Sequence, residues 1–226
     1  MTADAMLRKV LVSVEGQTEE TFVTEVLRPY LKPRGLTPQP VVLKTRHLPG
    51  HAAEKGGSVP YAKVKRELLG LLRDSSAVAI TTMYDFYALS RDFPGYATLP
   101  SGSGAQRVAH LEAALREDLA DRRFHPYLQL HEFESLLFAD VEKTHASLLG
   151  DRRQLEALRA ITREFPAPED IDEGHTTAPS KRLRAVFPAY QKASDGPLIT
   201  LEIGLEHLRA ACPHFNIWLT WLESLT

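Results

Sequence analysis

The sequence predicts an α/β fold: an open, mostly parallel sheet with helices on both faces and a helical C-terminal part. Two observations lead to this prediction. Short β-branched runs alternate with helical patterns in the order β-α-β-α-β, and one of these runs is apolar nearly throughout. A strand that is apolar on both sides lies inside a sheet covered on both faces. Parallel neighbours of this kind are joined by right-handed crossovers.

The first part of the chain supplies most of the sheet. A β-branched run ends at Glu15, and apolar residues at helical spacing follow it. A later helical pattern begins at a proline, which suits the first turn of a helix. We expect strands at 9–14, 41–45 and 77–83, and a helix at 60–72.

The remaining chain is expected to be mainly helical. Residues 105–120 form an amphipathic pattern, and 127–130 are a candidate fourth strand. From about residue 144 onward the pattern is helical, interrupted by 165–179. That segment is rich in prolines and acidic residues, so we expect a mobile loop there.

Length and composition indicate an ordinary globular protein. The 226 residues suffice for one large domain or one domain with an appendage. We expect an α/β body at 1–140 and a helical part at 141–226 packed on it, or one single domain. Hydrophobic residues make up 43% and charged residues 25%, which excludes collagen-like and wholly disordered chains. With a formal net charge of −2, any nucleic-acid surface must be a local patch.

Cysteine use and hydropathy indicate the compartment. Cys212 stands alone, so the chain has no internal disulfide and no multi-cysteine zinc site. No apolar run approaches the ~20 residues that span a bilayer, and the N-terminus lacks the pattern of a signal peptide. We therefore expect a cytoplasmic protein that does not contact the membrane.

Carboxylates at strand ends are the strongest candidates for chemistry. The sequence has no GxxxxGK[ST], HExxH or GxSxG motif. Ligands of open parallel sheets bind beyond the carboxyl ends of the strands, so Glu15 and Asp85 should lie at the same edge. Glu19 begins a predicted helix whose first turn points back toward that edge. A helix-start role for Glu15 and a plain turn at Asp85 remain the alternatives.

Two more acids follow the fourth strand. Glu132 and Glu134 would share one face on extended backbone, whereas a helix would separate them by about 200°. Carboxylates from three strand ends are hard oxygen ligands suited to Mg²⁺ or Mn²⁺, and such ions usually serve phosphate chemistry.

A basic residue near these acids would stabilise the charge on a phosphate. The candidate basic cluster consists of Lys181, Arg182, Arg184 and, further along the chain, Lys192. A solvated helix start explains this cluster equally well.

Several motifs resemble one bacterial family. They include Val14-Glu15-Gly16-Gln17-Thr18-Glu19-Glu20, Tyr84-Asp85-Phe86-Tyr87, His131-Glu132-Phe133-Glu134, Pro179-Ser180-Lys181-Arg182, Asp195-Gly196-Pro197-Leu198 and Cys212-Pro213-His214-Phe215. Together they cover nearly the whole chain. They resemble domain-of-unknown-function family 4276, which is regarded as related to Toprim domains and, more distantly, to the overcoming-lysogenization-defect (OLD) nucleases.

The resemblance implies roles for the first acidic residues. The OLD nucleases carry a Glu-x-x-x-Asp/Glu motif after the first strand, which Glu15 and Glu19 match. They carry Asp-x-Asp after the third strand, which Asp85 matches in its first position only. Tyr87 stands at the second position, and this departs from the pattern of a two-metal site.

The later positions of the family pattern are an acidic motif and a distal lysine. Glu132 and Glu134 correspond to the acids, and Lys181 to the lysine. By this resemblance Glu15, Asp85, Glu134 and Lys181 would be catalytic. The metal ligands would be Glu15, Glu19, Asp85, Glu132 and Glu134.

The function implied is that of a Toprim-like nuclease, dependent on Mg²⁺ or Mn²⁺, that cleaves DNA or RNA. Family members often lie beside an ABC/AAA-type ATPase, which implies the effector subunit of an ATPase-linked antiphage or toxin-like system. One alternative is a non-catalytic regulatory or partner module of such an ATPase, with a degenerate acidic site. A more remote one is another phosphotransfer enzyme that uses the same carboxylates.

Overall fold

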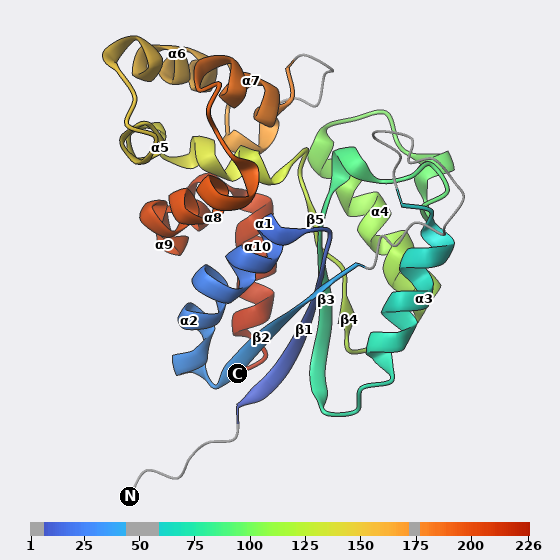
Figure 1. Cartoon of the computed structure of the whole chain (residues 1–226). Coiled ribbons are helices and arrows are strands. Elements are labelled where there is room, and N and C mark those ends of the chain that lie inside the picture. The colour runs from blue at the N-terminus through green and yellow to red at the C-terminus, as the bar shows by residue number, and fades with distance from the viewer. Residues whose placement is uncertain (1–6, 44–58, 172–176) are drawn as a thin grey trace, which may run out of the picture.

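The computed structural model describes residues 7–43, 59–171 and 177–226, and these form a parallel α/β fold. Helices cover both faces of a five-stranded sheet within this part of the chain (Figure 1). The strand order is β2-β1-β3-β4, with β5 also paired to β3, and every pairing is parallel. The strands are β1 (Arg8–Val14), β2 (Leu36–Val42), β3 (Ala77–Asp85), β4 (Phe124–His125) and β5 (Leu128–Gln129). The predicted fold class is confirmed.

Helices α1 (Gln17–Phe22) and α2 (Arg28–Leu31) follow β1 and are joined by a π-helical turn at Val23–Leu27. Helices α3 (Tyr61–Leu72) and α4 (Gly104–Leu119) cover the opposite face of the sheet. The C-terminal part contains α5 (Val141–Ser147), α6 (Arg152–Arg163), α7 (Pro179–Val186), α8 (Lys192–Ile203), α9 (Leu205–Ala211) and α10 (Pro213–Glu223). A 3₁₀ helix at Phe133–Ala139 leads into this part.

The two faces of the sheet belong to two hydrophobic cores. Val10, Val12 and Val14 enter the core beneath α1 and the C-terminal helices, whereas Leu11 enters the core beneath α3 and α4. This alternation follows from the two-residue period of a strand. It explains why β1 and β3 are apolar on both sides.

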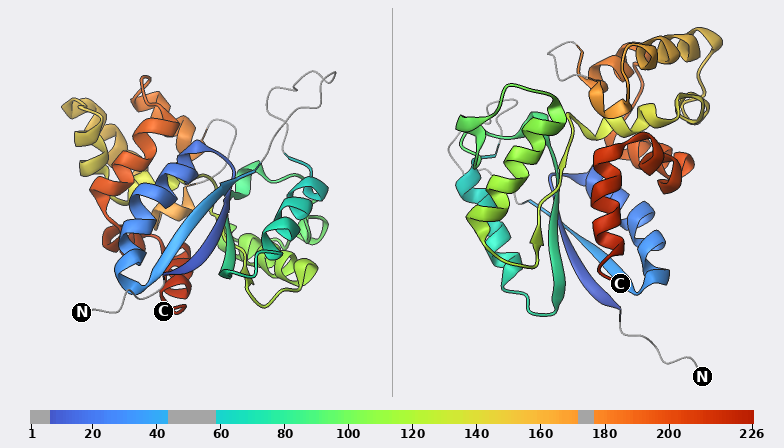
Figure 2. Two further views of the ribbon diagram at one scale, coloured as in Figure 1. Left: turned by 60° about the horizontal axis from the view of Figure 1, so that its bottom comes forward. Right: turned by 180° about the vertical axis from the view of Figure 1, so that it is seen from behind.

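The C-terminal helices complete the first of these cores. Ile199 of α8, Leu208 of α9 and Trp218 of α10 are buried in the same cluster as the valines of β1. Figure 2 shows α10 lying along the sheet beside α2, while α5, α6 and α7 gather at one end of the molecule. The helical part at 141–226 therefore shares a core with the body at 1–140.

Strand β2 differs from the strand predicted at 41–45. It begins at Leu36 and pairs with β1 through Val42, so it contains Pro38 and Pro40. A proline cannot donate to a strand ladder, but an edge strand has one free side and tolerates it. Residues 44 and 45 lie outside the described part of the chain.

The strand predicted at 127–130 is the shorter strand β5, and a second short strand that was not predicted, β4, precedes it; both pair with β3. Between them, Tyr127 pairs with a side chain instead of the β3 backbone. The hydroxyl of Thr82 donates to the Tyr127 carbonyl at 2.8 Å and accepts from its N–H at 2.9 Å. Pro126 lacks an N–H, which interrupts the regular ladder at this point.

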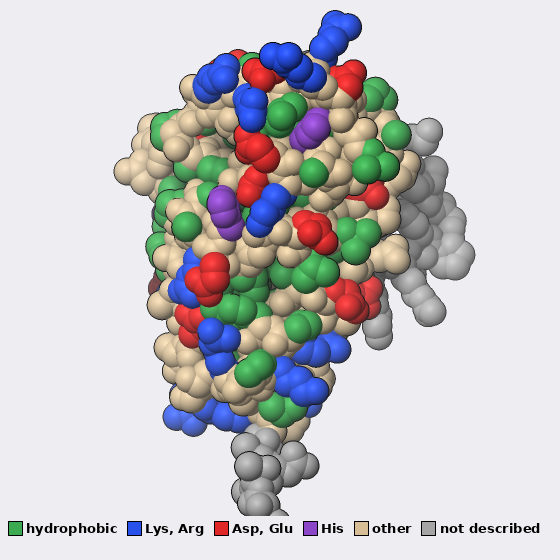
Figure 3. Space-filling model, turned by 90° about the vertical axis from the view of Figure 1, so that its left-hand side faces the viewer, with side chains coloured by type: hydrophobic (Ala, Val, Ile, Leu, Met, Phe, Trp, Pro, Cys, Tyr) green, Lys and Arg blue, Asp and Glu red, His purple; other side chains and the backbone are tan. Residues whose placement is uncertain are grey.

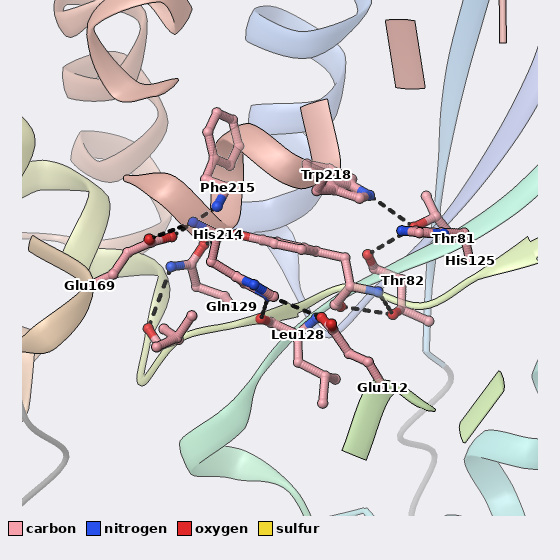
Figure 4. Close-up of polar contacts among 12 residues, drawn as sticks. Thr81, Thr82, Glu112, His125, Leu128, Gln129, Glu169, His214, Phe215 and Trp218 are labelled. Carbon is pink, nitrogen blue, oxygen red and sulfur yellow. Dashed lines mark hydrogen bonds and ion pairs between the residues drawn. The ribbon is translucent and has the colours of Figure 1, made fainter. Parts of the chain in front are cut away.

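The segment at 165–179, predicted as a mobile loop, is partly buried among the residues that the structure describes. Glu169 and Ile171 are buried. The two carboxylate oxygens of Glu169 accept from the backbone N–H groups of His214 and Phe215, at 2.8 and 2.9 Å, and so cap the start of α10 (Figure 4). These bonds hold the acidic segment in place. Residues 172–176 lie outside the described part.

Among the described helices, none is both long and apolar enough to cross a membrane.

Candidate functional site

The carboxyl ends of β1 and β3 bring Glu15 and Asp85 together. The parallel register pairs Val14 with Met83, so both acids leave the sheet at the same edge. The pKa of Glu15 is raised well above its usual value by burial first, and then by the neighbouring charges of Asp85 and Glu19. Such crowding of carboxyl groups is costly for folding alone and is typical of functional sites.

Glu19 turns back toward this edge from the first turn of α1. Its Oε2 accepts a hydrogen bond from the backbone N–H of Gly16 at 3.1 Å, and only 4% of the residue is exposed. Burial, followed by the charge of Asp85, raises the pKa of Glu19 to about 7. The neighbouring Glu20 is exposed.

Asp85, at the end of β3, binds Phe133 after β5 and Lys192 at the start of α8. Its Oδ1 accepts from the backbone N–H of Phe133 at 2.8 Å, and its Oδ2 lies 3.1 Å from the ammonium nitrogen of Lys192. Burial raises the pKa of Asp85, and the charge of Lys192 opposes this effect. The carboxylate therefore positions the segment after β5 and holds a cation.

Glu134 is completely buried and faces the same cation. Its Oε2 lies 3.1 Å from Lys192 Nζ, while Oε1 has no hydrogen-bond partner among the described residues. Burial is the main cause of the raised pKa of Glu134. A buried carboxylate oxygen without a partner is costly, so it marks a place where a ligand, water or ion would bind.

Glu132 has a different contact from Glu134. The backbone is extended at Glu132 and turns into a 3₁₀ helix at Phe133, so the two side chains take different directions. Glu132 Oε2 accepts from the backbone N–H of Ser180 at 2.9 Å, at the start of α7. The turn is entered through His131, whose φ of 61° lies in the left-handed region that few non-glycine residues adopt.

Lys192 is the basic residue that the structure brings to the acids. It is the first residue of α8, which packs against α1 and the 3₁₀ helix at Phe133–Ala139. Burial lowers the pKa of Lys192, but Asp85 and Glu134 more than offset this, so the net shift is upward. Lys181 instead lies exposed in the first turn of α7, and none of its described contacts reaches these carboxylates. On the face that Figure 3 shows, Lys and Arg side chains lie at both ends of the molecule, including the end that carries α6 and α7.

A close contact helps to place Lys192. A Cβ atom on Gly196 would lie 3.1 Å from the Tyr190 hydroxyl and 3.2 Å from the Phe133 ring, so glycine lets α8 approach the site. The buried Tyr190 hydroxyl has no hydrogen-bond partner among the described residues. In the sequence, the Asp-Gly-Pro motif that follows Lys192 was the signal for this contact. Its glycine allows α8 to pack closely against Phe133 and so brings Lys192 to the acids.

The acidic cluster offers oxygen ligands of the type that Mg²⁺ and Mn²⁺ prefer, but the described side chains do not form a metal position. Asp85 and Glu134 offer carboxylate oxygens, one of them unpartnered, with Glu15 and Glu19 nearby. In the arrangement described, the acids surround the Lys192 ammonium, and no three acidic, histidine or cysteine side chains of the described ranges converge on a metal position. An ion would thus share Asp85 and Glu134 with Lys192.

Fold and site together define an α/β protein with a buried acidic cluster and one lysine at the carboxyl edge of a parallel sheet. The chain belongs to the family described as domain of unknown function (DUF4276), whose model matches residues 14–223. The family resemblance of the sequence is therefore confirmed. No curated protein matches the chain.

Two solved structures resemble the chain distantly. The C-terminal region of the Burkholderia pseudomallei OLD protein is 13% identical, with 97% of this chain and 100% of that chain covered and a TM-score of 0.45. The C-terminal region of the Xanthomonas campestris pv. campestris OLD protein is 16% identical, with 95% of both chains covered and a TM-score of 0.41. Because both likenesses are distant, family membership rests on the family match.

Proposed function

We propose that this protein is a nuclease that hydrolyses phosphodiester bonds of DNA or RNA with the help of Mg²⁺ or Mn²⁺. The observation that carries the proposal is the group of four acids, Glu15, Glu19, Asp85 and Glu134, around Lys192 at the sheet edge. Structural stability alone does not call for this many carboxylates of raised pKa at one place. The family pattern of acids and a distal lysine supports the same reading, with Lys192 in the position first expected for Lys181.

Each residue has a role that follows from its contacts. Asp85 and Glu134 would hold the divalent ion, which when bound supplies an activated water and positive charge at neutral pH. Lys192, already placed beside both acids, would donate to a non-bridging phosphate oxygen as its charge increases. Glu19, buried at the same edge beside Asp85, is placed to take a proton from the attacking water. Glu132 positions the segment by its bond to the Ser180 N–H.

A cleavage assay with matched variants tests the proposal. Labelled single-stranded and double-stranded DNA and RNA are incubated with Mg²⁺ or Mn²⁺, with and without the ABC/AAA-type ATPase partner and ATP. We expect Asp85→Asn to lower the cleavage rate by a factor of about 100 or more. Asparagine is chosen because its amide oxygen can still accept from the Phe133 N–H. The control is Glu20→Gln, which removes the charge of an exposed acid on α1, and it should cleave normally.

The ATPase partner is part of the proposal. An effector subunit held by an ATPase could be silent on its own, so the complex with ATP is the decisive sample. If the complex that contains Asp85→Asn cleaves as fast as the wild-type complex, the acidic cluster has no catalytic role.

One observation favours a second candidate, a regulatory module of the same ATPase. The Lys192 ammonium neutralises Asp85 and Glu134, and Tyr87 stands where a second aspartate would complete the metal pattern. In that case Asp85→Asn would change the ATPase rate of the complex, and no metal or nucleic acid would yield cleavage. The two candidates therefore give opposite results in the same experiment.

A further inference from the structure

An aromatic pocket is formed in part by the two residues that follow Asp85 in the chain. It is a cavity of about 210 Å³ lined by Phe86, Tyr87, Tyr96 and Arg107. Phe86 and Tyr87 continue the chain from Asp85 in a short 3₁₀ turn, Tyr96 begins a second such turn, and Arg107 lies on α4. Because Phe86 and Tyr87 directly follow Asp85 in the chain, their part of the pocket lies close to the acidic cluster.

The side chains of this pocket present aromatic rings and a cation. Tyr87 is 48% exposed, although most large apolar side chains of this fold are buried. The guanidinium carbon of Arg107 lies 4.9 Å from the centre of the Phe86 ring, a cation–π distance. The exposed Tyr87 ring can therefore contact a ligand in this pocket.

The pocket is also fixed to the acidic segment. The backbone N–H of Tyr87 donates to the carbonyl of His131 at 3.1 Å, one residue before Glu132. On the other side of the same segment, Asp85 accepts from the Phe133 N–H. The aromatic turn and the carboxylates therefore form one rigid unit at the sheet edge.

We propose that this pocket binds one unstacked nucleobase of a single-stranded DNA or RNA substrate, adjacent to the phosphodiester at the acidic cluster. The inference rests on the proposed nuclease function and narrows its substrate class. Proteins that bind single strands stack bases on aromatic side chains and support them with arginine, and every base offers a ring face for this contact. Tyr87, at the position of a missing second aspartate, thereby has a role in substrate binding.

The test measures binding without cleavage. Short single-stranded oligonucleotides, deoxyribo and ribo, carry one 2-aminopurine, whose fluorescence falls when it stacks on an aromatic ring. They are titrated with the full chain in EDTA, beside a matching duplex and free 2-aminopurine nucleoside. We expect quenching by single strands and weaker binding of the duplex. The tighter binding of either the deoxyribo or the ribo strand identifies the natural polymer. If the free nucleoside binds as tightly as the single strands, the assignment of a polymer substrate is wrong.

Variants of Tyr87 decide whether the pocket is responsible. Tyr87→Ala should weaken single-strand binding by about 5- to 150-fold, the loss expected for one stacked base, and abolish the quenching. Tyr87→Phe keeps the ring and should bind normally. Ile217→Ala removes another exposed side chain, on α10, and should change nothing. Circular dichroism confirms that each variant is folded.

Failure of the pocket and failure of the nuclease proposal give different results. If single strands bind through Tyr87 but no complex cleaves them, the pocket is right and the nuclease proposal is wrong. If the protein cleaves nucleic acid and Tyr87→Ala neither weakens binding nor removes quenching, the pocket assignment is wrong. Absence of quenching with every wild-type sample also overturns the pocket.

Discussion

The ammonium nitrogen of Lys192 lies 3.1 Å from Oδ2 of Asp85, although 107 residues separate the two in the chain. The contact joins the end of β3 to the start of α8, so the C-terminal helices supply part of a site whose other residues come from the sheet. Lys192 also lies 3.1 Å from Oε2 of Glu134, so one cation is shared by two buried acids. The site is therefore complete only when both parts of the chain have folded together.

This pairing predicts the effect of removing the cation. Lys192→Met, which keeps the length of the side chain, should lower the free energy of unfolding at pH 8 by about 1–3 kcal/mol, because Asp85 and Glu134 lose their counter-charge. At pH 5 the loss should be smaller, since both acids have raised pKa values and take up protons. Urea unfolding at the two pH values measures the effect.

Lys181→Met is the matched control for that variant. Lys181 is exposed, so its removal should change the free energy of unfolding by no more than about 0.5 kcal/mol at either pH. If both variants lose the same free energy of unfolding, the ion pairs of Lys192 with Asp85 and Glu134 do not stabilise the fold. Lys192→Arg keeps the charge and should recover part of the stability.

The pKa of Glu19 predicts how stability varies with pH. A carboxyl group whose pKa rises from 4.5 to about 7 on folding keeps its proton in the folded protein where the unfolded chain has lost it. The folded state then binds more protons between these values, so stability is highest below about pH 4.5 and falls as pH rises through 7. Glu19→Gln removes this cost and should gain on the order of 2 kcal/mol at pH 8 relative to pH 5.

Thermal melting in EDTA at pH 5, 6, 7 and 8 gives the measurement. The difference in melting temperature between Glu19→Gln and the wild type should grow with pH, and Glu20→Gln should follow the wild type throughout because Glu20 is exposed. A constant difference across this range would mean that Glu19 titrates normally.

The sheet was predictable from the sequence because burial on both faces leaves a direct pattern. The β-branched and apolar runs at β1 and β3 carry that pattern, and the helices between them carry its helical counterpart. Strand β2 was displaced by several residues in the prediction because Pro38 and Pro40 are normally breakers. Only the position of β2 at the edge, a property of the whole sheet, makes them tolerable.

The site was less predictable because side-chain partners depend on packing between distant segments. The sheet edge of Glu15 and Asp85 followed from strand order alone. Glu132 and Glu134 were divided by a 3₁₀ turn that starts between them and has no clear sequence signal. Lys181 and Lys192 have the same side chain, and only the docking of α8 on α1 decides which one reaches the acids.

Glu169 predicts a structural effect outside the site. Both of its oxygens accept backbone N–H groups at the start of α10, and 4% of the residue is exposed. Glu169→Ala should therefore lower the free energy of unfolding by about 1–3 kcal/mol, because one buried and one partly buried N–H donor lose their partner. Glu164→Ala, an exposed acid of the same segment paired at 3.4 Å with Arg182, should cost less than about 1 kcal/mol. Equal costs in denaturant unfolding would contradict the capping role.

The close packing of α8 at Gly196 predicts that a larger residue there would move Lys192 relative to the acids. A Cβ at this position would lie 3.1 Å from the Tyr190 hydroxyl, 3.2 Å from the Phe133 ring and 3.4 Å from the Thr18 methyl, so we expect Gly196→Ala to push α8 outward. Overpacking of this kind costs about 1–3 kcal/mol and should move Lys192 away from Asp85. Gly70→Ala on α3 is the control: no atom lies within 4 Å of its added Cβ, and the helix should gain about 0.5–1 kcal/mol. The lysine is followed through the pH dependence of unfolding. If Gly196→Ala loses stability mainly at pH 8, as Lys192→Met does, the added methyl has separated the ion pair, whereas an equal loss at all pH values would limit its effect to packing.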